Sequence, residues 1–328
     1  MCHNMYEYMD GFSPNLNKHL HVGHLSNFVI AKALQHMEVT KHTIAILGDT
    51  LDGSVDSQEA LESYLDLCTN YNYHIDDIHY ASIQKLKDES LLHNGTNDYK
   101  GTKVFHLPSG DKIVGIKESG STTYFYQDVA LAEHLNGSTL YVTGSEQNNH
   151  FNQLNSISHN EINHCGLGLV LIDGVKMSSS KGNVIFLSEM FDKLDFDDDQ
   201  LKYNIMAGQF LKSNPGSNKN VELSKLSNPK TSVGLYLSYT TARLYSAGLT
   251  LEEEPLKGKL EFLFLKSQKE LNPSILLKEL EVVANSINKL YLTHTIKDNT
   301  ENQIMFKKLG DQLVSGMMKL GMYNINKV

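Results

Sequence analysis

Strand-like and helix-like segments alternate along the first half of this chain, and this alternation limits the possible folds more than any other feature. We predict strands over residues 6–12, 43–47, 102–107, 112–117, 139–143 and 166–172, and helices over residues 22–37, 57–72, 125–136 and 148–158. Strands that alternate with helices are typical of a parallel sheet joined by helical crossovers. The sequence therefore predicts an α/β fold with a parallel sheet.

The pattern changes after residue 190, where helical periodicity replaces the alternation. Apolar residues recur there at the 3.6-residue period of a helix, at Leu276, Leu280, Val283, Ile287 and Leu290. The polar stretch 213–220 predicts a loop. We therefore predict an α/β domain over residues 1–190 with a short insertion around 55–120, a connecting stem over 191–231, and a smaller all-α bundle over 232–328.

Composition excludes several classes of protein. The chain has 328 residues, which is enough for two domains, and no run of 18 apolar residues that would predict a transmembrane helix. Its first residues show no basic region followed by an apolar stretch, so no secretory signal is predicted. Cys2, Cys68 and Cys165 are far apart, which argues against a disulfide framework or a zinc ribbon. We expect a cytoplasmic protein without a membrane partner.

The charge of the chain argues against tight, non-specific binding to a polyanion, because the formal net charge is −9. Residues 255–328 differ from the rest, with 11 lysines against 7 acidic residues. Only one of the 29 basic residues is an arginine, Arg243. Lysine binds phosphate as a point charge and lacks the planar fork of arginine, so the sequence offers few bidentate phosphate contacts.

The first stretch whose residues could bind a ligand or catalyse a reaction has the sequence SPN at residues 13–15 and HVGH at residues 21–24. Gly23 would let an adenine approach the backbone, and the helix that starts here would offer phosphate its N-terminal donors. His21 and His24 can donate hydrogen bonds to phosphoryl oxygens. Alternatively, His24 is a structural residue bonded to a carbonyl. Zinc binding by His19, His21 and His24 lacks a nearby carboxylate, so no metal site is predicted.

The second stretch is KMSSSKGN at residues 176–183, after a predicted buried strand and a turn. Lys176 and Lys181 can neutralise a leaving pyrophosphate, and the residues between them can fold over a triphosphate. Those residues, predicted to bind ATP together with Gly23, are Met177, Ser178, Ser179 and Ser180. Two alternatives remain, a solvated loop and the Ser-x-x-Lys nucleophile motif, whose companion motifs are absent from the sequence.

The two stretches together resemble the HIGH and KMSKS motifs of class I aminoacyl-tRNA synthetases, and the match is closest to arginyl-tRNA synthetases. Residues 13–25 are similar to that family's SPN…HVGHL segment, and residues 177–185 to its MSxRKGNVV segment. Residues 124–128 resemble its YxxxD motif and residues 141–150 its YVxxxxQxxH motif. More faintly, residues 239–243 resemble the YxxAR of its anticodon-binding helical domain.

The resemblance implies that the α/β domain is a Rossmann-like, nucleotide-binding catalytic domain. It also implies a site for the arginine side chain. In the family, the tyrosine and aspartate of YxxxD and the glutamine of the next motif hold the guanidinium, and the matching residues are Tyr124, Asp128 and Gln147. A spacing of four places Tyr124 and Asp128 on one face of a helix, and a carboxylate can accept two parallel bonds from a guanidinium. The structural alternative is that Asp128 is a surface residue or a helix N-terminal charge.

The resemblance also implies a site for the amino-acid head group. Asn15, in the SPN segment that begins with Ser13, matches the family's asparagine that contacts this group. Asp10 stands where the family usually has a glutamate that holds the α-amino group. The predicted substrate-binding set therefore includes Asp10, Ser13 and Asn15.

The chain departs from the family in three regions that bind tRNA. The family's N-terminal domain, which contacts the tRNA elbow, does not precede the first motif, the insertion is short, and the helical domain is under 100 residues.

The sequence predicts an ATP-dependent ligase that activates L-arginine as arginyl-adenylate, with Mg²⁺ bound to the nucleotide. The acceptor is tRNA, or a small molecule, peptide or protein amine. The opposing hypothesis is a non-catalytic arginine or tRNA sensor.

Overall fold

The computed structural model describes residues 5–47, 55–80, 98–99, 101–176, 184–297 and 299–328. The chain divides into two compact units, and each is described by itself. Unit 1 consists of residues 1–20 and 40–167, and unit 2 of residues 21–39 and 168–328. The two compact units divide the chain at residues 20, 39 and 167. They do not test the predicted domain boundaries at residues 190 and 231, which stay a prediction.

Unit 1 is built on a five-stranded, wholly parallel sheet with the strand order β3-β2-β1-β7-β8. Its strands are β1 (Tyr6–Asp10), β2 (Thr40–Leu47), β3 (Asp77–Tyr80), β7 (Thr139–Gly144) and β8 (Ile162–Leu167). The order reverses between β1 and β7, and in open parallel sheets ligands bind at the carboxyl ends of the strands beside such a reversal. The predicted fold class is confirmed, and Asp10 is the last residue of β1.

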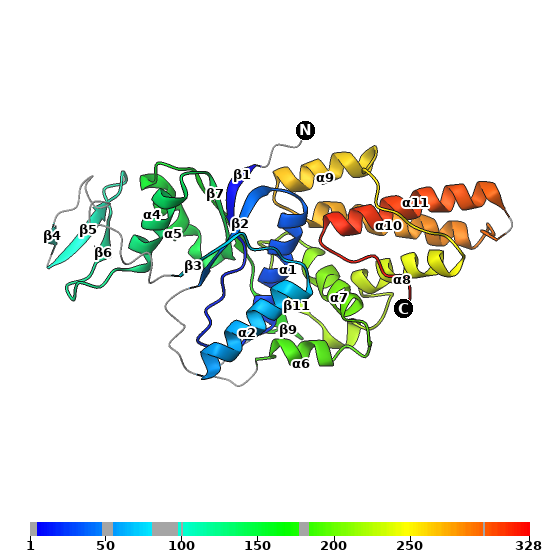
Figure 1. The fold of residues 1–328 in the computed structure, drawn as a ribbon, viewed down its shortest axis with the longest axis horizontal. Coiled ribbons are helices and arrows are strands. Elements are labelled where there is room, and N and C mark those ends of the chain that lie inside the picture. Colours follow the sequence, from blue (N-terminus) through cyan, green and yellow to red (C-terminus); the bar gives the residue numbers. More distant parts are fainter. Residues whose placement is uncertain (1–4, 48–54, 81–97, 100, 177–183, 298) are drawn as a thin grey trace. The chain divides into compact units, whose positions relative to one another are not determined.

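The described part of unit 1 also contains the helices α2 (Val55–Asn70), α4 (Tyr124–Leu135) and α5 (Asn148–Ile157), of which α4 carries Tyr124 and Asp128. Figure 1 shows α4 and α5 beside β7, and their apolar residues Phe125, Tyr126, Phe151 and Leu154 share a buried cluster with Tyr141 of that strand. A separate antiparallel sheet, β4 (Asp98–Tyr99), β5 (Thr102–His106) and β6 (Lys112–Ile116), lies before α4 in the chain. The Thr123 hydroxyl caps α4 and donates to the Val114 carbonyl of β6 at 2.8 Å.

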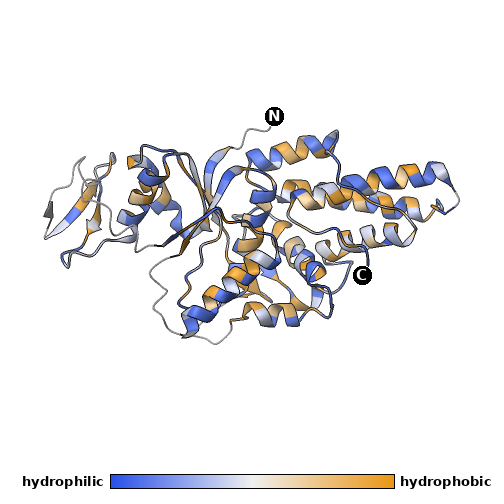
Figure 2. Cartoon of the chain, viewed as in Figure 1, coloured by the Kyte–Doolittle hydropathy of each residue, from blue (hydrophilic) through white to orange (hydrophobic). Residues whose placement is uncertain are grey.

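Unit 2 combines α1 with the second half of the chain. Its elements are α1 (Val22–His36), β9 (Val170–Ile172), β10 (Val175–Lys176), α6 (Leu187–Asp192), α7 (Asp199–Leu211), β11 (Lys219–Val221), α8 (Val233–Ser246), α9 (Lys259–Lys269), α10 (Ser274–Tyr291) and α11 (Thr300–Lys319). Helix α7 packs closely on α8, and this requires a glycine at position 234. A Cβ there would lie 1.7 Å from the carbonyl oxygen of Asn204. Figure 2 shows hydrophobic and hydrophilic residues alternating along α9, α10 and α11, as expected for helices with one buried side.

Two sequence-based predictions differ from the structure. The strand predicted over residues 166–172 is interrupted after Leu167, and the chain resumes as β9 at Val170. Gly168 lies at the break, where its N–H donates to the Pro215 carbonyl at 2.9 Å and a Cβ would lie 2.2 Å from the Ser217 carbonyl oxygen. The loop predicted over residues 213–220 is shorter, because β11 begins at Lys219 and pairs with β9.

The apolar period predicted near the C-terminus is found in α10, where Leu276, Leu280 and Ile287 are buried. None of the helices in the described part of the chain is long and apolar enough to cross a membrane.

Candidate functional site

Asp10 places a buried carboxylate at the carboxyl end of β1. Its side chain accepts a hydrogen bond from the Ser13 hydroxyl, and the Ser13 oxygen in turn accepts one from the Ile46 N–H at 2.7 Å. Burial raises the pKa of the Asp10 carboxyl to about 7; the bond from Ser13 opposes this shift, and the charge of Asp128 adds to it. Ser13 therefore ties Asp10 to the backbone of β2 and fixes the direction of its carboxylate.

Asp128 lies on the second turn of α4 and is partly buried, with 22% of its side chain exposed. Its Oδ2 is 2.6 Å from His150 Nε2 of α5, a short distance typical of a charge-assisted hydrogen bond. The His150 ring is held between Phe125 and Phe151, at centroid distances of 5.4 and 5.1 Å. This packing orients the Asp128 carboxylate. His150 was not among the predicted site residues, although it is the last residue of the YVxxxxQxxH match.

Tyr141 is the second residue that the sequence-based site left out. It is opposite Asp10 in the β1–β7 register, so the two side chains lie on the same face of the sheet. Tyr141 is 1% exposed, and its hydroxyl has no hydrogen-bond partner among the described residues. Burial, followed by the charges of Asp128 and Asp10, raises the pKa of this hydroxyl well above its ordinary value. The pairing of β7 with β1, which places Tyr141 opposite Asp10, was the feature that could have identified Tyr141 as a site residue.

The remaining predicted residues of unit 1 lie on its surface. Tyr124, the first residue of α4, is 74% exposed, and Gln147, the last residue of a short 3₁₀ turn after β7, is also exposed. Asn15 is exposed, and its Oδ1 accepts a hydrogen bond from the Asn17 N–H at 3.1 Å. Unit 1 therefore brings Asp10, Ser13 and Asp128 into one electrostatic neighbourhood, while Tyr124, Gln147 and Asn15 are open to solvent.

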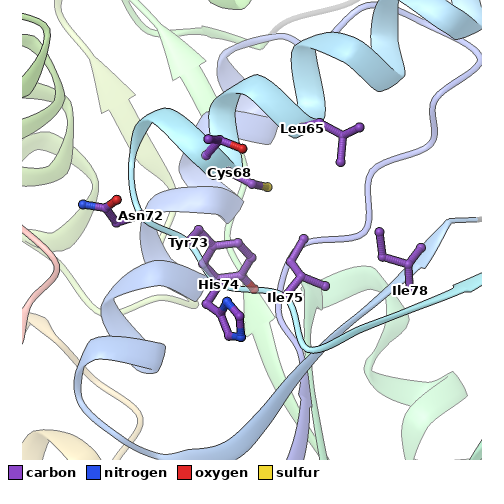
Figure 3. A pocket seen from close by; sticks show the side chains of 8 residues that line it. Leu65, Cys68, Asn72, Tyr73, His74, Ile75 and Ile78 are labelled. Carbon is purple, nitrogen blue, oxygen red and sulfur yellow. The ribbon is translucent and has the colours of Figure 1, made fainter.

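A pocket of about 480 Å³ lies elsewhere in unit 1, at the C-terminal end of α2 and the segment after it (Figure 3). Leu65, Cys68, Tyr73, Ile75 and Ile78 are among its lining residues. No predicted site residue lines this pocket. It is therefore distinct from the carboxylate cluster, although the Asp10 charge contributes to the raised pKa of Tyr73.

His21 and His24 form the cap at the N-terminus of α1, in unit 2. His21 Nδ1 accepts a bond from the Gly23 N–H, and His24 Nδ1 accepts one from the His21 N–H, each at 3.1 Å. The two rings stack at 3.9 Å between centroids. Burial and the neighbouring His21 lower the pKa of His24 to about 3, so its imidazole is neutral at pH 7. A neutral ring that accepts at Nδ1 carries its proton at Nε2 and donates there.

The structure joins the end of the second motif to this cap. The Val22 N–H donates to the Ile185 carbonyl at 3.1 Å, and His21 forms an antiparallel bridge with Phe186. Lys176 ends β10, where it pairs with Leu171 of β9 and is exposed. Five predicted residues lie outside the described residues, namely Met177, Ser178, Ser179, Ser180 and Lys181. Segments about 160 residues apart in the chain thus meet at the N-terminus of α1.

The structure offers no protein cage for a metal ion in the part of the chain that it describes, where no three His, Cys, Asp or Glu side chains are grouped suitably. Mg²⁺ is commonly held by one or two carboxylates and by substrate phosphates, rather than by a full protein cage. The described residues are compatible with a Mg²⁺ ion that is bound together with its nucleotide.

Comparison with known proteins places the chain beside the arginine–tRNA ligases. It is 25% identical over 260 residues to the arginine–tRNA ligase of Lactobacillus acidophilus, a match that covers 64% of this chain and 46% of the relative. The chain spans about half the length of the curated relatives it matches. No protein-family model matches the chain.

Among solved structures, arginyl-tRNA synthetases also have a fold similar to that of this chain. The arginyl-tRNA synthetase of Thermus thermophilus superposes with a TM-score of 0.71 at 14% identity, covering 98% of this chain and 82% of that one. The arginyl-tRNA synthetase of Plasmodium falciparum superposes with a TM-score of 0.67 at 17% identity, covering 99% and 78%. At these identities the superpositions show the fold alone. The predicted resemblance to class I synthetases of the arginyl type is confirmed in sequence similarity and in fold.

Proposed function

We propose that this chain activates L-arginine with ATP, forming arginyl-adenylate and pyrophosphate, and passes the arginyl group to an acceptor as an arginine–tRNA ligase does. The observation that carries this proposal is the buried carboxylate of Asp10 at the carboxyl end of β1, beside the strand-order reversal of a parallel sheet, together with a second carboxylate, Asp128, whose charge raises the pKa of Asp10. Two neighbouring anionic groups suit a ligand with two cationic groups, and arginine has an α-ammonium and a guanidinium.

Asp10 would bind the α-ammonium group of the amino acid. Its carboxylate is held by Ser13, so it is oriented before the ligand arrives. Asn15, exposed five residues further along the chain, would contact the same head group. A buried carboxylate gains more from an ammonium partner than an exposed one, because water screens the pair less.

Asp128 would bind the guanidinium, with Tyr124 and Gln147 as further contacts. His150 already donates to, or shares a proton with, one carboxylate oxygen of Asp128, which leaves the other oxygen for a guanidinium N–H. Tyr124 lies one helical turn before Asp128 and can cover the planar face of the guanidinium. Exposure of Tyr124 and Gln147 is compatible with this role, since such side chains can become buried against a ligand.

ATP would be bound by unit 2, through the N-terminus of α1 and the KMSSSKGN segment. The helix N-terminus favours anionic phosphate, and its first turn contains no acidic residue. Gly23 lies in this first turn, while His21 and His24 would donate from Nε2 to phosphoryl oxygens. Lys176 and Lys181 would neutralise the pyrophosphate, with Met177, Ser178, Ser179 and Ser180 around the triphosphate.

The chemistry then needs no nucleophilic side chain. A carboxylate oxygen of arginine attacks the α-phosphorus of ATP, and the bond from that phosphorus to the bridging oxygen breaks, with the electron pair leaving on pyrophosphate. Mg²⁺, when bound with ATP, would neutralise part of the triphosphate charge. The residues of the chain bind, orient and stabilise charge, which are sufficient sources of catalysis for this type of reaction.

The test is ATP–pyrophosphate exchange across a panel of amino acids, with and without bulk tRNA. The proposal predicts exchange with arginine, weak exchange with lysine, and none with citrulline, which has the same shape but no charge. Exchange that is absent with arginine in both conditions would contradict the proposal. Attachment of labelled arginine to tRNA would identify tRNA as the acceptor, whereas exchange without attachment would favour a small-molecule, peptide or protein amine.

A further inference from the structure

The Tyr141 hydroxyl is a buried polar group without a protein partner, and it lies beside the proposed amino-acid site. The Tyr141 ring stacks on Phe151 at 4.5 Å between centroids and is part of the same apolar cluster as Phe125, Tyr126 and Leu154. A phenylalanine would fill this place equally well. A buried hydroxyl left unpaired is destabilising, so the oxygen of Tyr141 reduces stability unless a ligand pairs with it.

The charges around this hydroxyl indicate the kind of ligand that would pair with it. Its strongest electrostatic neighbours are Asp128 and Asp10, and both are carboxylates. Because it is buried and lies near two carboxylates, the Tyr141 phenol keeps its proton, remains neutral and retains oxygen lone pairs that accept hydrogen bonds. An anionic ligand would be repelled by the two aspartates. A ligand with several N–H donors and a positive charge would instead satisfy the carboxylates and the hydroxyl together.

We propose that the Tyr141 hydroxyl is a specificity-determining contact of the amino-acid site, which accepts a hydrogen bond from an N–H of the cationic ligand between Asp10 and Asp128. This inference rests on the proposed function. An arginine side chain carries five N–H donors in a fixed plane, more than the ammonium of lysine offers. The guanidinium donors are spread over three nitrogen atoms in one plane and can reach acceptors on two elements, Asp128 of α4 and Tyr141 of β7, whereas the donors of a lysine ammonium all radiate from one nitrogen.

The test replaces one atom. Tyr141→Phe removes the hydroxyl and keeps the ring that stacks on Phe151. Tyr126→Phe is the matched control, because Tyr126 is equally buried and belongs to the same apolar cluster. Arginine and lysine binding are measured by titration calorimetry on the full chain, together with the KM for ATP in pyrophosphate exchange and the thermal midpoint of unfolding.

We expect Tyr141→Phe to weaken arginine binding about tenfold, with a smaller effect on lysine, the KM for ATP unchanged and the thermal midpoint unchanged or raised. Tyr126→Phe should leave arginine binding unchanged. Equal arginine affinity in Tyr141→Phe and wild type would overturn the assignment. A lowered midpoint with ATP and arginine weakened alike would also overturn it, since that pattern indicates a structural hydroxyl. Wild-type protein that binds no arginine would instead contradict the proposed function itself.

Discussion

At the scale of single residues, the protonation state of Asp10 decides whether the site can bind a cationic head group. Its carboxyl has a pKa of about 7 in the folded protein because it is buried, so the protonated and ionised forms coexist near neutral pH. A protonated carboxyl does not attract an ammonium group. The ligand therefore has to compete with the proton.

We predict that arginine binds more tightly as the pH rises. Below pH 7 the affinity should increase up to tenfold per pH unit, and it should level off above pH 7 to 8, where Asp10 is ionised. Binding at pH 7 should release protons, because the α-ammonium lowers the pKa of Asp10. Calorimetry from pH 5.5 to 8.5, in buffers of different ionisation enthalpy, measures both effects. A flat profile that matches the Asp10→Asn variant would show that Asp10 does not bind the head group.

The same carboxyl affects folding with a definite sign. Its folded pKa lies above the unfolded value near 4, so the folded state binds the extra proton between about pH 4 and pH 7. The contribution of Asp10 to stability is therefore largest at low pH and is lost as the pH rises through 7. A site that is destabilised by its own ionised carboxylate at neutral pH is stabilised when a cation binds.

At the scale of elements, the cap of α1 serves two purposes with the same pair of imidazoles. Nδ1 of each ring satisfies a backbone N–H at the helix start, which leaves Nε2 as the donating atom. Because His24 has a pKa of about 3, its donor is neutral at physiological pH. The cap thus determines the direction in which the proposed phosphate donors point.

His24→Asn should separate the two purposes. The asparagine side-chain oxygen can replace Nδ1 as acceptor in the cap, so the free energy of unfolding should change by about 1 kcal/mol or less. The phosphoryl contact is lost, and we expect kcat for pyrophosphate exchange to fall about 100-fold or more. His19→Asn, an exposed histidine outside the cap, is the control. Unchanged kcat in His24→Asn would remove His24 from the proposed mechanism.

Local pattern predicted the elements well, and its failures have physical reasons. The period-2 and 3.6-residue patterns report burial of one element, so they identified α1, β2, α4, β7 and α5 within a few residues. They do not report where the chain changes partners. The break at Gly168 depends on the carbonyls of Pro215 and Ser217, nearly 50 residues away, and no local pattern contains that contact.

The candidate site likewise contains residues that local sequence predicted and residues that only long-range contacts reveal. The motif residues predicted Asp10 and Asp128, of which the second raises the pKa of the first through its charge, and they predicted the histidines of the α1 cap. His150 and Tyr141 entered only through helix packing and strand register. Buried Lys32 of α1 was also not predicted, although it donates to the Tyr323 hydroxyl at 3.1 Å and lies over the Tyr203 ring. Such long-range partners cannot be read from local sequence.

At the scale of the whole molecule, the proposed reaction divides between the two units. Unit 1 carries the carboxylates assigned to the amino acid, and unit 2 carries the histidine cap and the lysines assigned to ATP. Neither set alone can form an adenylate. The proposed function therefore requires both units, and the activity must depend on arginine and on ATP.

The most direct test is arginine-dependent pyrophosphate exchange in wild type and in Asp128→Asn, which keeps the size of the side chain and removes its charge. Asp66→Asn, on the exposed side of α2, is the control. A hydrogen bond to a charged group contributes about 1.5–3 kcal/mol, so we expect the KM for arginine to rise about 10- to 150-fold in Asp128→Asn. The KM for ATP should not change. An Asp128→Asn enzyme with the wild-type KM for arginine would contradict the guanidinium site on which this account depends.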